Sequence, residues 1–178
     1  NSDLVIIAAR PGMGKTSFSL NIVMHAGLVH GLKVGFFSLE MAKEQLMMRM
    51  LSTKSKINFG KIRTGFLSDT EFQKTVDAAE AIQRANIFID DTPALTSLDL
   101  RSRTRRLKSD KGLDILIVDY LQLMRGNSRT DNREREIAEI SLSLKALAKE
   151  LQIPIIAISQ LSRQTEARTD KKPQLSDL

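Results

Sequence analysis

Residues 9–17, ARPGMGKTS, constrain the fold of this chain more than any other stretch. They lie between an apolar run at 4–9, which predicts a β-strand, and an amphipathic stretch from Thr16, which predicts a helix. Gly12 and Gly14 permit a tight turn with inward-pointing N–H groups, and the dipole of the following helix favours an anion at the bend. This context is typical of a phosphate-binding loop, in which Lys15 reaches the outer phosphates and the Thr16 hydroxyl holds Mg²⁺.

The loop meets the pattern G-x-x-x-x-G-K-[ST] except at its first position, where the chain has Ala9. The structural alternative is a glycine-rich turn whose Lys and Thr cap a helix. Nine residues are predicted to contact a nucleotide: Ala9, Arg10, Pro11, Gly12, Met13, Gly14, Lys15, Thr16 and Ser17.

Composition narrows the class of protein. A chain of 178 residues fits one domain with a real core, and its 42% hydrophobic and 27% charged residues are ordinary for a soluble protein. The absence of cysteine excludes disulfides and thiol catalysis, and the apolar runs are too short to span a bilayer. The net charge of +6 favours a polyanionic partner, although it also suits simple solubility. Because the chain begins with Asn, we expect it to be part of a longer polypeptide.

Predicted strands alternate with predicted helices along the chain. Further strands are expected at 33–38, 86–91, 114–119 and 153–160, and helices at 17–31, 44–51, 69–84, 98–108 and 135–151, with a looser stretch at 58–65. This alternation predicts an α/β fold with a parallel sheet. The first helix is expected to bury Phe18, Ile22, Leu28 and Val29, and the arginines of 98–108 are expected to form a solvated face.

Polar residues follow the predicted strands where a parallel sheet gathers its ligands. Asp119 ends an apolar run and is predicted to hold Mg²⁺, the alternative being a carboxylate that caps the next turn. Related ATPases often place a Glu directly after this Asp, but here the position is Tyr120. Glu40 is therefore the predicted water-activating base, with a helix-capping role as alternative. Gln160 is predicted to sense the γ-phosphate, the alternative being a buried amide that ties two loops together.

Two basic segments follow the last two predicted strands. Since both leave the edge that carries the nucleotide, we predict that they contact nucleic-acid phosphates, with ordinary solvated loops as the alternative. The residues predicted with this role are Arg125, Arg129, Arg133, Arg163, Arg168, Lys171 and Lys172.

Four motifs in this order, AARPGMGKT, FFSLEM, IVDYLQLM and ISQLSRQTEAR, together resemble the RecA-like motor domain of the DnaB-type hexameric replicative helicases of bacteria. The resemblance covers essentially the whole chain. It implies a three-layer RecA-like P-loop NTPase with strand order 3-2-4-5-1 and further strands beyond the end of this sequence. It also implies catalytic roles for Lys15, Glu40 and Gln160, a metal role for Thr16 and Asp119, and a nucleotide contact for Arg49.

The same resemblance implies what the whole protein does. Residues 1–178 would form a motor domain that uses Mg²⁺ and ATP to move 5′ to 3′ on single-stranded DNA in a homohexamer. Primase and a helicase loader would be partners, in the bacterial cytoplasm at the replication fork and without a membrane. The arginine finger and main DNA loop would lie beyond residue 178, so we expect this segment alone to turn over ATP slowly. A RecA-type recombinase or repair ATPase, and a nucleotide-gated assembly switch, are the alternatives.

Overall fold

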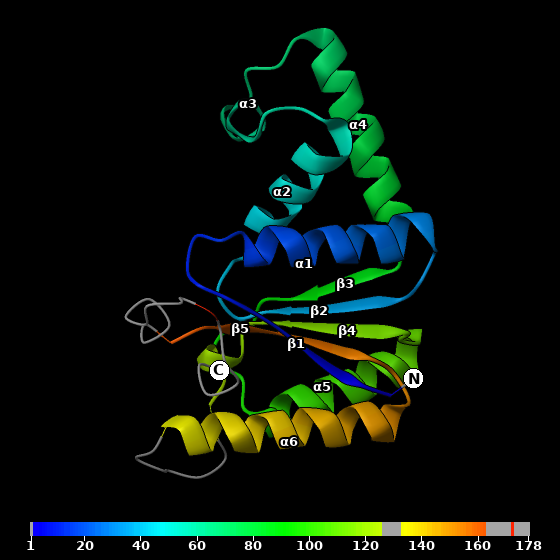
Figure 1. Ribbon diagram of the computed structural model, residues 1–178. Helices are drawn as coiled ribbons and strands as arrows, with labels where there is room; N and C mark the ends of the chain where they lie inside the picture. Colours follow the sequence, from blue (N-terminus) through cyan, green and yellow to red (C-terminus); the bar gives the residue numbers. More distant parts are fainter. Residues whose placement is uncertain (1, 126–132, 163–171, 173–178) are drawn as a thin grey trace.

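The protein folds around a parallel five-stranded sheet, shown in the computed structural model of Figure 1, which describes residues 2–125, 133–162 and 172. The strands lie in the order β1-β5-β4-β2-β3. Their bounds are β1 (Leu4–Ala9), β2 (Val34–Ser38), β3 (Ile87–Asp90), β4 (Ile115–Asp119) and β5 (Ile155–Gln160). The order is the expected RecA-like order read from the other edge, so the predicted α/β class and topology are confirmed.

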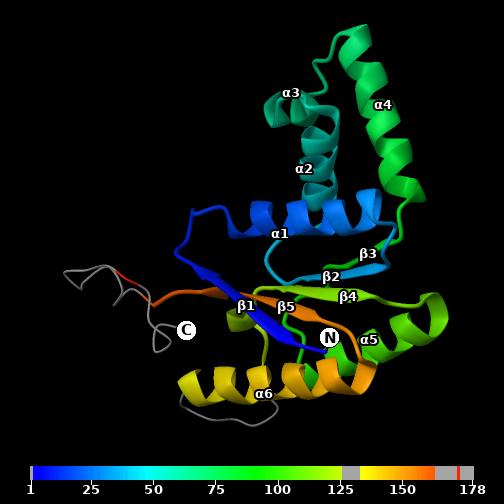
Figure 2. The ribbon, with the colours of Figure 1, turned by 45° about the vertical axis from the view of Figure 1, so that its right-hand side comes forward.

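Helices cover both faces of the sheet, which gives the three layers. Helix α1 lies on one face and α5 and α6 lie on the other, while α2, α3 and α4 stack beyond α1 (Figures 1 and 2). The helices are α1 (Lys15–Met24), which continues as a π-helical turn (His25–Val29), α2 (Lys43–Ser55), α3 (Phe59–Thr64), α4 (Asp69–Arg84), α5 (Ser97–Lys111), the 3-10 turn η2 (Leu121–Leu123) and α6 (Arg133–Leu151). No helix in the described part of the chain has the length and apolarity needed to cross a bilayer.

The central strands separate two apolar cores. Phe36 and Ile117 point into the cluster beneath α1, together with Leu20. Their neighbours Phe37 and Leu116 point into the cluster beneath α5 and α6. A strand buried on both faces must be apolar at successive positions, and this explains the unbroken apolar runs that predicted β2 and β4.

Side-chain caps fix where several helices begin. A capping box of Ser68 and Glu71 starts α4, and Thr96 with Asp99 forms a second one at α5. Helix α2 has no cap from its own N-cap residue, Ala42. Instead the Asp91 carboxylate, at the end of β3, accepts a hydrogen bond of 2.9 Å from the backbone N–H of Lys43.

Two local predictions are wrong. Helix α1 buries Ser19, Leu20, Val23 and Met24, whereas Phe18 and Val29 are 56% and 66% exposed. The loop sets this rotation, because Lys15 and Thr16 face the pocket described below and carry the residues one and two turns later toward the sheet.

The stretch 58–65, predicted to be irregular, contains α3. The Asn58 side chain caps the helix by accepting from the Gly60 N–H, and Gly65 ends it with a φ of 76°. A helix this short has too little periodicity to be detected in the sequence.

The basic run of α5 lies on the surface, as predicted, but much of it is paired. Arg101 and Arg105 both contact Glu150 on α6, and Arg103 contacts Asp90 at the end of β3. These arginines therefore tie α5 to neighbouring elements, although exposed pairs of this kind contribute only about 0–1 kcal/mol each.

Candidate functional site

The loop between β1 and α1 has the backbone of an anion-binding turn. Gly12 and Gly14 have φ values of 78° and 82°, in the left-handed region that side chains disfavour. A Cβ at either glycine would meet nothing within 4 Å, so the backbone conformation, not crowding, requires glycine. Gly14 is the N-cap of α1 and supplies no side-chain cap. The first-turn N–H groups are thus left for a ligand with negative charge.

A polar pocket of about 340 Å³ opens over this loop. It is lined by Pro11, Gly12, Gly14, Lys15, Thr16, Ser17, Glu40, Met41, Arg49 and Gln160. Elements far apart in sequence contribute to it, namely the loop, the ends of β2 and β5, and α2. The Lys15 ammonium bends back across the loop and donates to the Arg10 carbonyl at 3.4 Å. That long contact is easily exchanged for an anionic partner.

Not every predicted loop residue lines the pocket. Ala9 pairs with Gln160 across the β1–β5 ladder, and its carbonyl accepts from the Leu161 N–H. The Arg10 guanidinium donates to the Leu161 carbonyl at 2.8 Å, and Met13 is 73% exposed. Ala9 and Arg10 therefore tie the loop to the end of β5, whereas all residues from Pro11 to Ser17 except Met13 line the pocket.

Asp119 ends β4 behind the pocket and is only 1% exposed. Neither of its carboxylate oxygens has a hydrogen-bond partner among the described residues. Burial raises the pKa of Asp119, and the negative charge of Glu40 adds to this. The nearby Thr16 hydroxyl and Lys15 ammonium pull that pKa back down, but neither closes a hydrogen bond to the carboxylate.

A buried acid with two unpaired oxygens is costly unless something binds it. The Asp119 carboxylate faces the Thr16 hydroxyl, and oxygen donors of these two kinds are what Mg²⁺ prefers in proteins. The predicted metal residues therefore fit a divalent cation. The alternative, that Asp119 caps the following turn through its side chain, finds no hydrogen bond to support it.

This unpaired carboxylate leads to a stability prediction. A raised pKa means that the folded state binds the proton more tightly, so the Asp119 contribution to stability falls as the pH rises above the ordinary value of 3.8. Asp119→Asn removes that dependence and should stabilise the nucleotide-free, full-length protein at neutral pH by about 1–2 kcal/mol. Thermal unfolding with and without Mg²⁺ and nucleotide measures this, and the ligands should stabilise only the wild type strongly.

Asp114→Asn is the matched control for that measurement. Asp114 precedes β4 and already accepts a hydrogen bond of 2.8 Å from the Lys33 N–H. Its replacement should not raise the unfolding temperature. A lower unfolding temperature for Asp119→Asn than for the wild type would contradict the interpretation of Asp119 as an unsatisfied acid.

Glu40 is exposed at the end of β2 and lines the pocket. The turn that presents it is fixed by the Ser38 hydroxyl, which accepts from the Met41 N–H and donates to the Met41 carbonyl. Burial raises the pKa of Tyr120, as it does that of Asp119, and the negative charge of Glu40 adds to both shifts. The alternative role as a cap of α2 is wrong, because Asp91 binds the first helical N–H there.

Gln160 ends β5 and lines the same pocket. The residue that ties two loops together is Gln122, in η2. Its side-chain amide binds both the N–H and the carbonyl of Gln160, each at 3.1 Å. Sequence reasoning gave Gln122 no role, although a lone amide inside the apolar motif YLQLM was the available signal.

Arg49 and the basic segments complete the predicted set. Arg49 lines the pocket from α2, and its guanidinium lies 5.4 Å from the centre of the Phe59 ring. Arg125 is exposed, and its N–H bonds the Leu95 carbonyl. Lys172 is exposed. Arg133 begins α6, but its side chain is not among those that the structure describes. Arg129, Arg163, Arg168 and Lys171 also lie outside the described residues.

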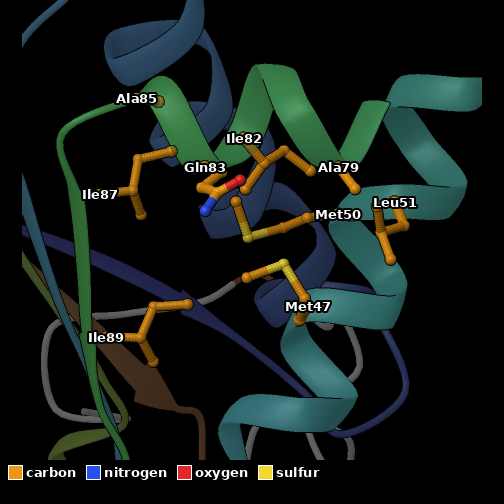
Figure 3. Close-up of a pocket in the computed structure, with 9 residues that line it drawn as sticks. All are labelled: Met47, Met50, Leu51, Ala79, Ile82, Gln83, Ala85, Ile87 and Ile89. Atoms are coloured by element: carbon orange, nitrogen blue, oxygen red, sulfur yellow. The ribbon is translucent and has the colours of Figure 1, made fainter. Parts of the chain in front are cut away.

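A second pocket, of about 360 Å³, lies between α2, α4 and β3. Figure 3 shows that Met47 and Met50 approach Ile82, Ile87 and Ile89 there. Its lining is apolar apart from the Gln83 amide and contains no titratable side chain. This pocket therefore offers no acid, base or phosphate-binding cation, and the chemistry belongs to the polar pocket over the loop.

The fold and the polar pocket together define a nucleotide-binding P-loop domain with the RecA-like strand order. Comparison with known proteins identifies the family. The DnaB-like helicase C terminal domain model matches residues 1–178, and the chain belongs to that family.

Two proteins similar in sequence to this chain are replicative DNA helicases. The replicative DNA helicase DnaB of Buchnera aphidicola is 52% identical over 99% of this chain, and that of Geobacillus stearothermophilus is 48% identical over 99%. The chain spans only 38% and 39% of those two proteins. Among solved structures, one ATPase domain has a TM-score of 0.91 and 40% identity, covering 99% of this chain and 63% of that one. A DnaB-like replicative helicase, studied with primase, has the same TM-score and identity, covering 99% and 43%.

Proposed function

We propose that this chain is the motor domain of a bacterial replicative DNA helicase, which couples the hydrolysis of Mg²⁺-bound ATP to movement on single-stranded DNA. The observation that carries the proposal is the polar pocket. It gathers Lys15, Thr16, Glu40 and Gln160 at the carboxyl edge of the sheet, with the unpaired acid Asp119 behind them. Membership of the helicase family supports the same function.

The loop would bind the phosphates of ATP. Its N–H groups and the start of α1 face the pocket, and Lys15 exchanges its long contact with the Arg10 carbonyl for a phosphate oxygen. The Thr16 hydroxyl and the Asp119 carboxylate would hold Mg²⁺. When bound, the cation neutralises charge on the phosphates and on the leaving group.

Glu40 would act on the attacking water. Its carboxylate is exposed to the pocket, is not used as a helix cap, and sits on a turn fixed by Ser38. The water loses a proton to a Glu40 oxygen as its own oxygen attacks the γ-phosphorus, and the bond to the β-phosphate oxygen breaks. Gln160 would contact the γ-phosphate through its side-chain amide, and Arg49 would add positive charge from α2.

The position and the positive charge of two basic segments support DNA binding. Both basic segments follow strands, β4 and β5, that end at the pocket. Release of the γ-phosphate beside Gln160 would therefore change the position of the segment that starts at Leu161. The residues proposed to contact DNA phosphates are Arg125, Arg129, Arg133, Arg163, Arg168, Lys171 and Lys172.

The assembly follows from the family. We propose a homohexamer in the bacterial cytoplasm at the replication fork, with primase and a helicase loader as partners and no membrane. One solved structure similar to this chain concerns interactions of such a helicase with primase, which supports that partner. An arginine finger from the remainder of the protein would complete the ATP site, so this segment alone should hydrolyse ATP slowly.

Strand displacement by the full-length protein tests the function. On a forked DNA with a free 5′ tail, we expect unwinding that requires ATP and Mg²⁺ and is lost in Glu40→Gln. Electron microscopy of the same protein should show closed six-fold rings. Open helical filaments would favour a recombinase, and rings that bind ATP without unwinding any fork would favour an assembly switch; either result would contradict the proposal.

A further inference from the structure

Gln122 bridges the carboxyl ends of β4 and β5. Its Nε2 donates to the Ser159 hydroxyl at 2.8 Å and to the Gln160 carbonyl at 3.1 Å. Its Oε1 accepts from the Gln160 N–H at 3.1 Å. One side chain thus binds both backbone groups of the residue that reaches the pocket.

These contacts replace missing strand pairing. The β4–β5 ladder pairs Leu116 with Ile155, Ile117 with Ile156 and Val118 with Ala157. After Asp119 the chain turns into η2, so no β4 backbone lies opposite Gln160. The amide of Gln122 has the same donor and acceptor as a peptide group, and it extends the ladder to the end of β5.

The backbone of Gln160 and Leu161 is also held on the side that faces β1. Gln160 pairs with Ala9 of β1, and the Arg10 guanidinium binds the Leu161 carbonyl. The backbone of Gln160 is therefore clamped between the phosphate-binding loop and a residue three positions after Asp119. Both clamps bind the backbone of Gln160 and leave its side chain unused, and Gln160 lines the pocket.

We propose that Gln122 is a positioning residue, which holds Gln160 in register with Asp119 so that the Gln160 amide meets the γ-phosphate. This inference rests on the proposed function, because it gives Gln122 a role only through Gln160. Gln122 itself does not line the pocket and should not touch the nucleotide.

The test uses Gln122→Met in the full-length protein, because Met keeps the length of the side chain and removes the hydrogen bonds to Ser159 and Gln160. We expect kcat for ATP hydrolysis, measured with single-stranded DNA, to fall about 10- to 100-fold, as for a misplaced catalytic group. The dissociation constant of a fluorescent ATP analogue should stay within about twofold, since Lys15 and the loop are unchanged. Gln73→Met, an exposed change on α4, is the matched control and should behave as wild type.

A double-mutant cycle separates positioning from general structure. In a Gln160→Ala background, Gln122→Met should change kcat by less than about twofold, because the group it positions is absent. Equal effects in both backgrounds would overturn the inference, as would an unchanged kcat in Gln122→Met. If Gln122→Met does not fold, Ser159→Ala serves in its place: a loss of kcat that disappears in the Gln160→Ala background supports the inference, and no loss overturns it.

The same assays separate this inference from the function on which it rests. A wild-type protein without ATPase activity, or one unaffected by Glu40→Gln, refutes both. An active wild type that depends on Glu40 and is indifferent to Gln122→Met refutes the inference alone.

Discussion

Replacing Glu40 with Gln should lower kcat for ATP hydrolysis by the full-length protein about 10²- to 10⁴-fold, the range contributed by general bases. The variant keeps the shape of the side chain and removes only its ability to accept a proton. The exposed position of Glu40 in the pocket, and the capping of α2 by Asp91, leave Glu40 no structural task that this change would damage. Steady-state phosphate release gives kcat, and titration with a fluorescent ATP analogue gives affinity, which should change only a few-fold.

Glu44→Gln is the matched control for this result. Glu44 is an exposed acid in the first turn of α2, the helix that follows Glu40, and it does not line the polar pocket. Its replacement should leave kcat within about twofold. If Glu40→Gln retained most of the wild-type kcat, another group would have to activate the water, and the assignment from the end of β2 would be wrong.

Lys15→Ala should weaken nucleotide binding itself. The Lys15 ammonium crosses the loop and has only a 3.4 Å contact with the Arg10 carbonyl, so a phosphate is its natural strong partner. Loss of a charge-assisted contact in a pocket costs about 1.5–3 kcal/mol, which corresponds to about a 10- to 150-fold rise in the dissociation constant of ATP. Equilibrium titration with and without Mg²⁺ measures this change.

Lys15→Ala should change the stability of the nucleotide-free protein only slightly. Lys15 makes no ion pair among the described residues, so nucleotide-free Lys15→Ala should lose only the attraction to Asp119 and unfold slightly below the wild-type temperature. Lys74→Ala, an exposed change on α4, serves as the charge-matched control and should leave ATP affinity unchanged. Wild-type affinity in Lys15→Ala would place the phosphates away from the loop.

The topology was predictable because its signals are local. The strands β2 and β4 are buried on both faces, so their sequences are unbroken apolar runs, and the box of Ser68 and Glu71 marks the start of α4 within four residues. The strand ends then gave Glu40, Asp119 and Gln160, because parallel strands bring their carboxyl ends to one edge.

What was missed depends on contacts between distant residues. The cap of α2 comes from Asp91, 48 positions after the N–H that it binds, and Gln122 meets Gln160 at a separation of 38. The inner face of α1 carries Leu20, Val23 and Met24, and the prediction chose the other apolar stripe, which contains the exposed Phe18. No periodicity or spacing rule predicts the contacts of Asp91 and Gln122, whereas the spacing of Leu20, Val23 and Met24 was an available signal for the buried face of α1.

The central claim is that one nucleotide is held by the loop, the end of β2 and the end of β5 together. A crystal structure of the full-length protein with a non-hydrolysable ATP analogue and Mn²⁺, located by its anomalous signal, tests it most directly. We predict phosphates against residues 11–17 with Lys15 in contact, the metal beside Thr16 and Asp119, and Glu40 and Gln160 on either side of the γ-phosphate. Phosphates outside the loop, or Glu40 and Gln160 both turned away from the γ-phosphate, would contradict that claim.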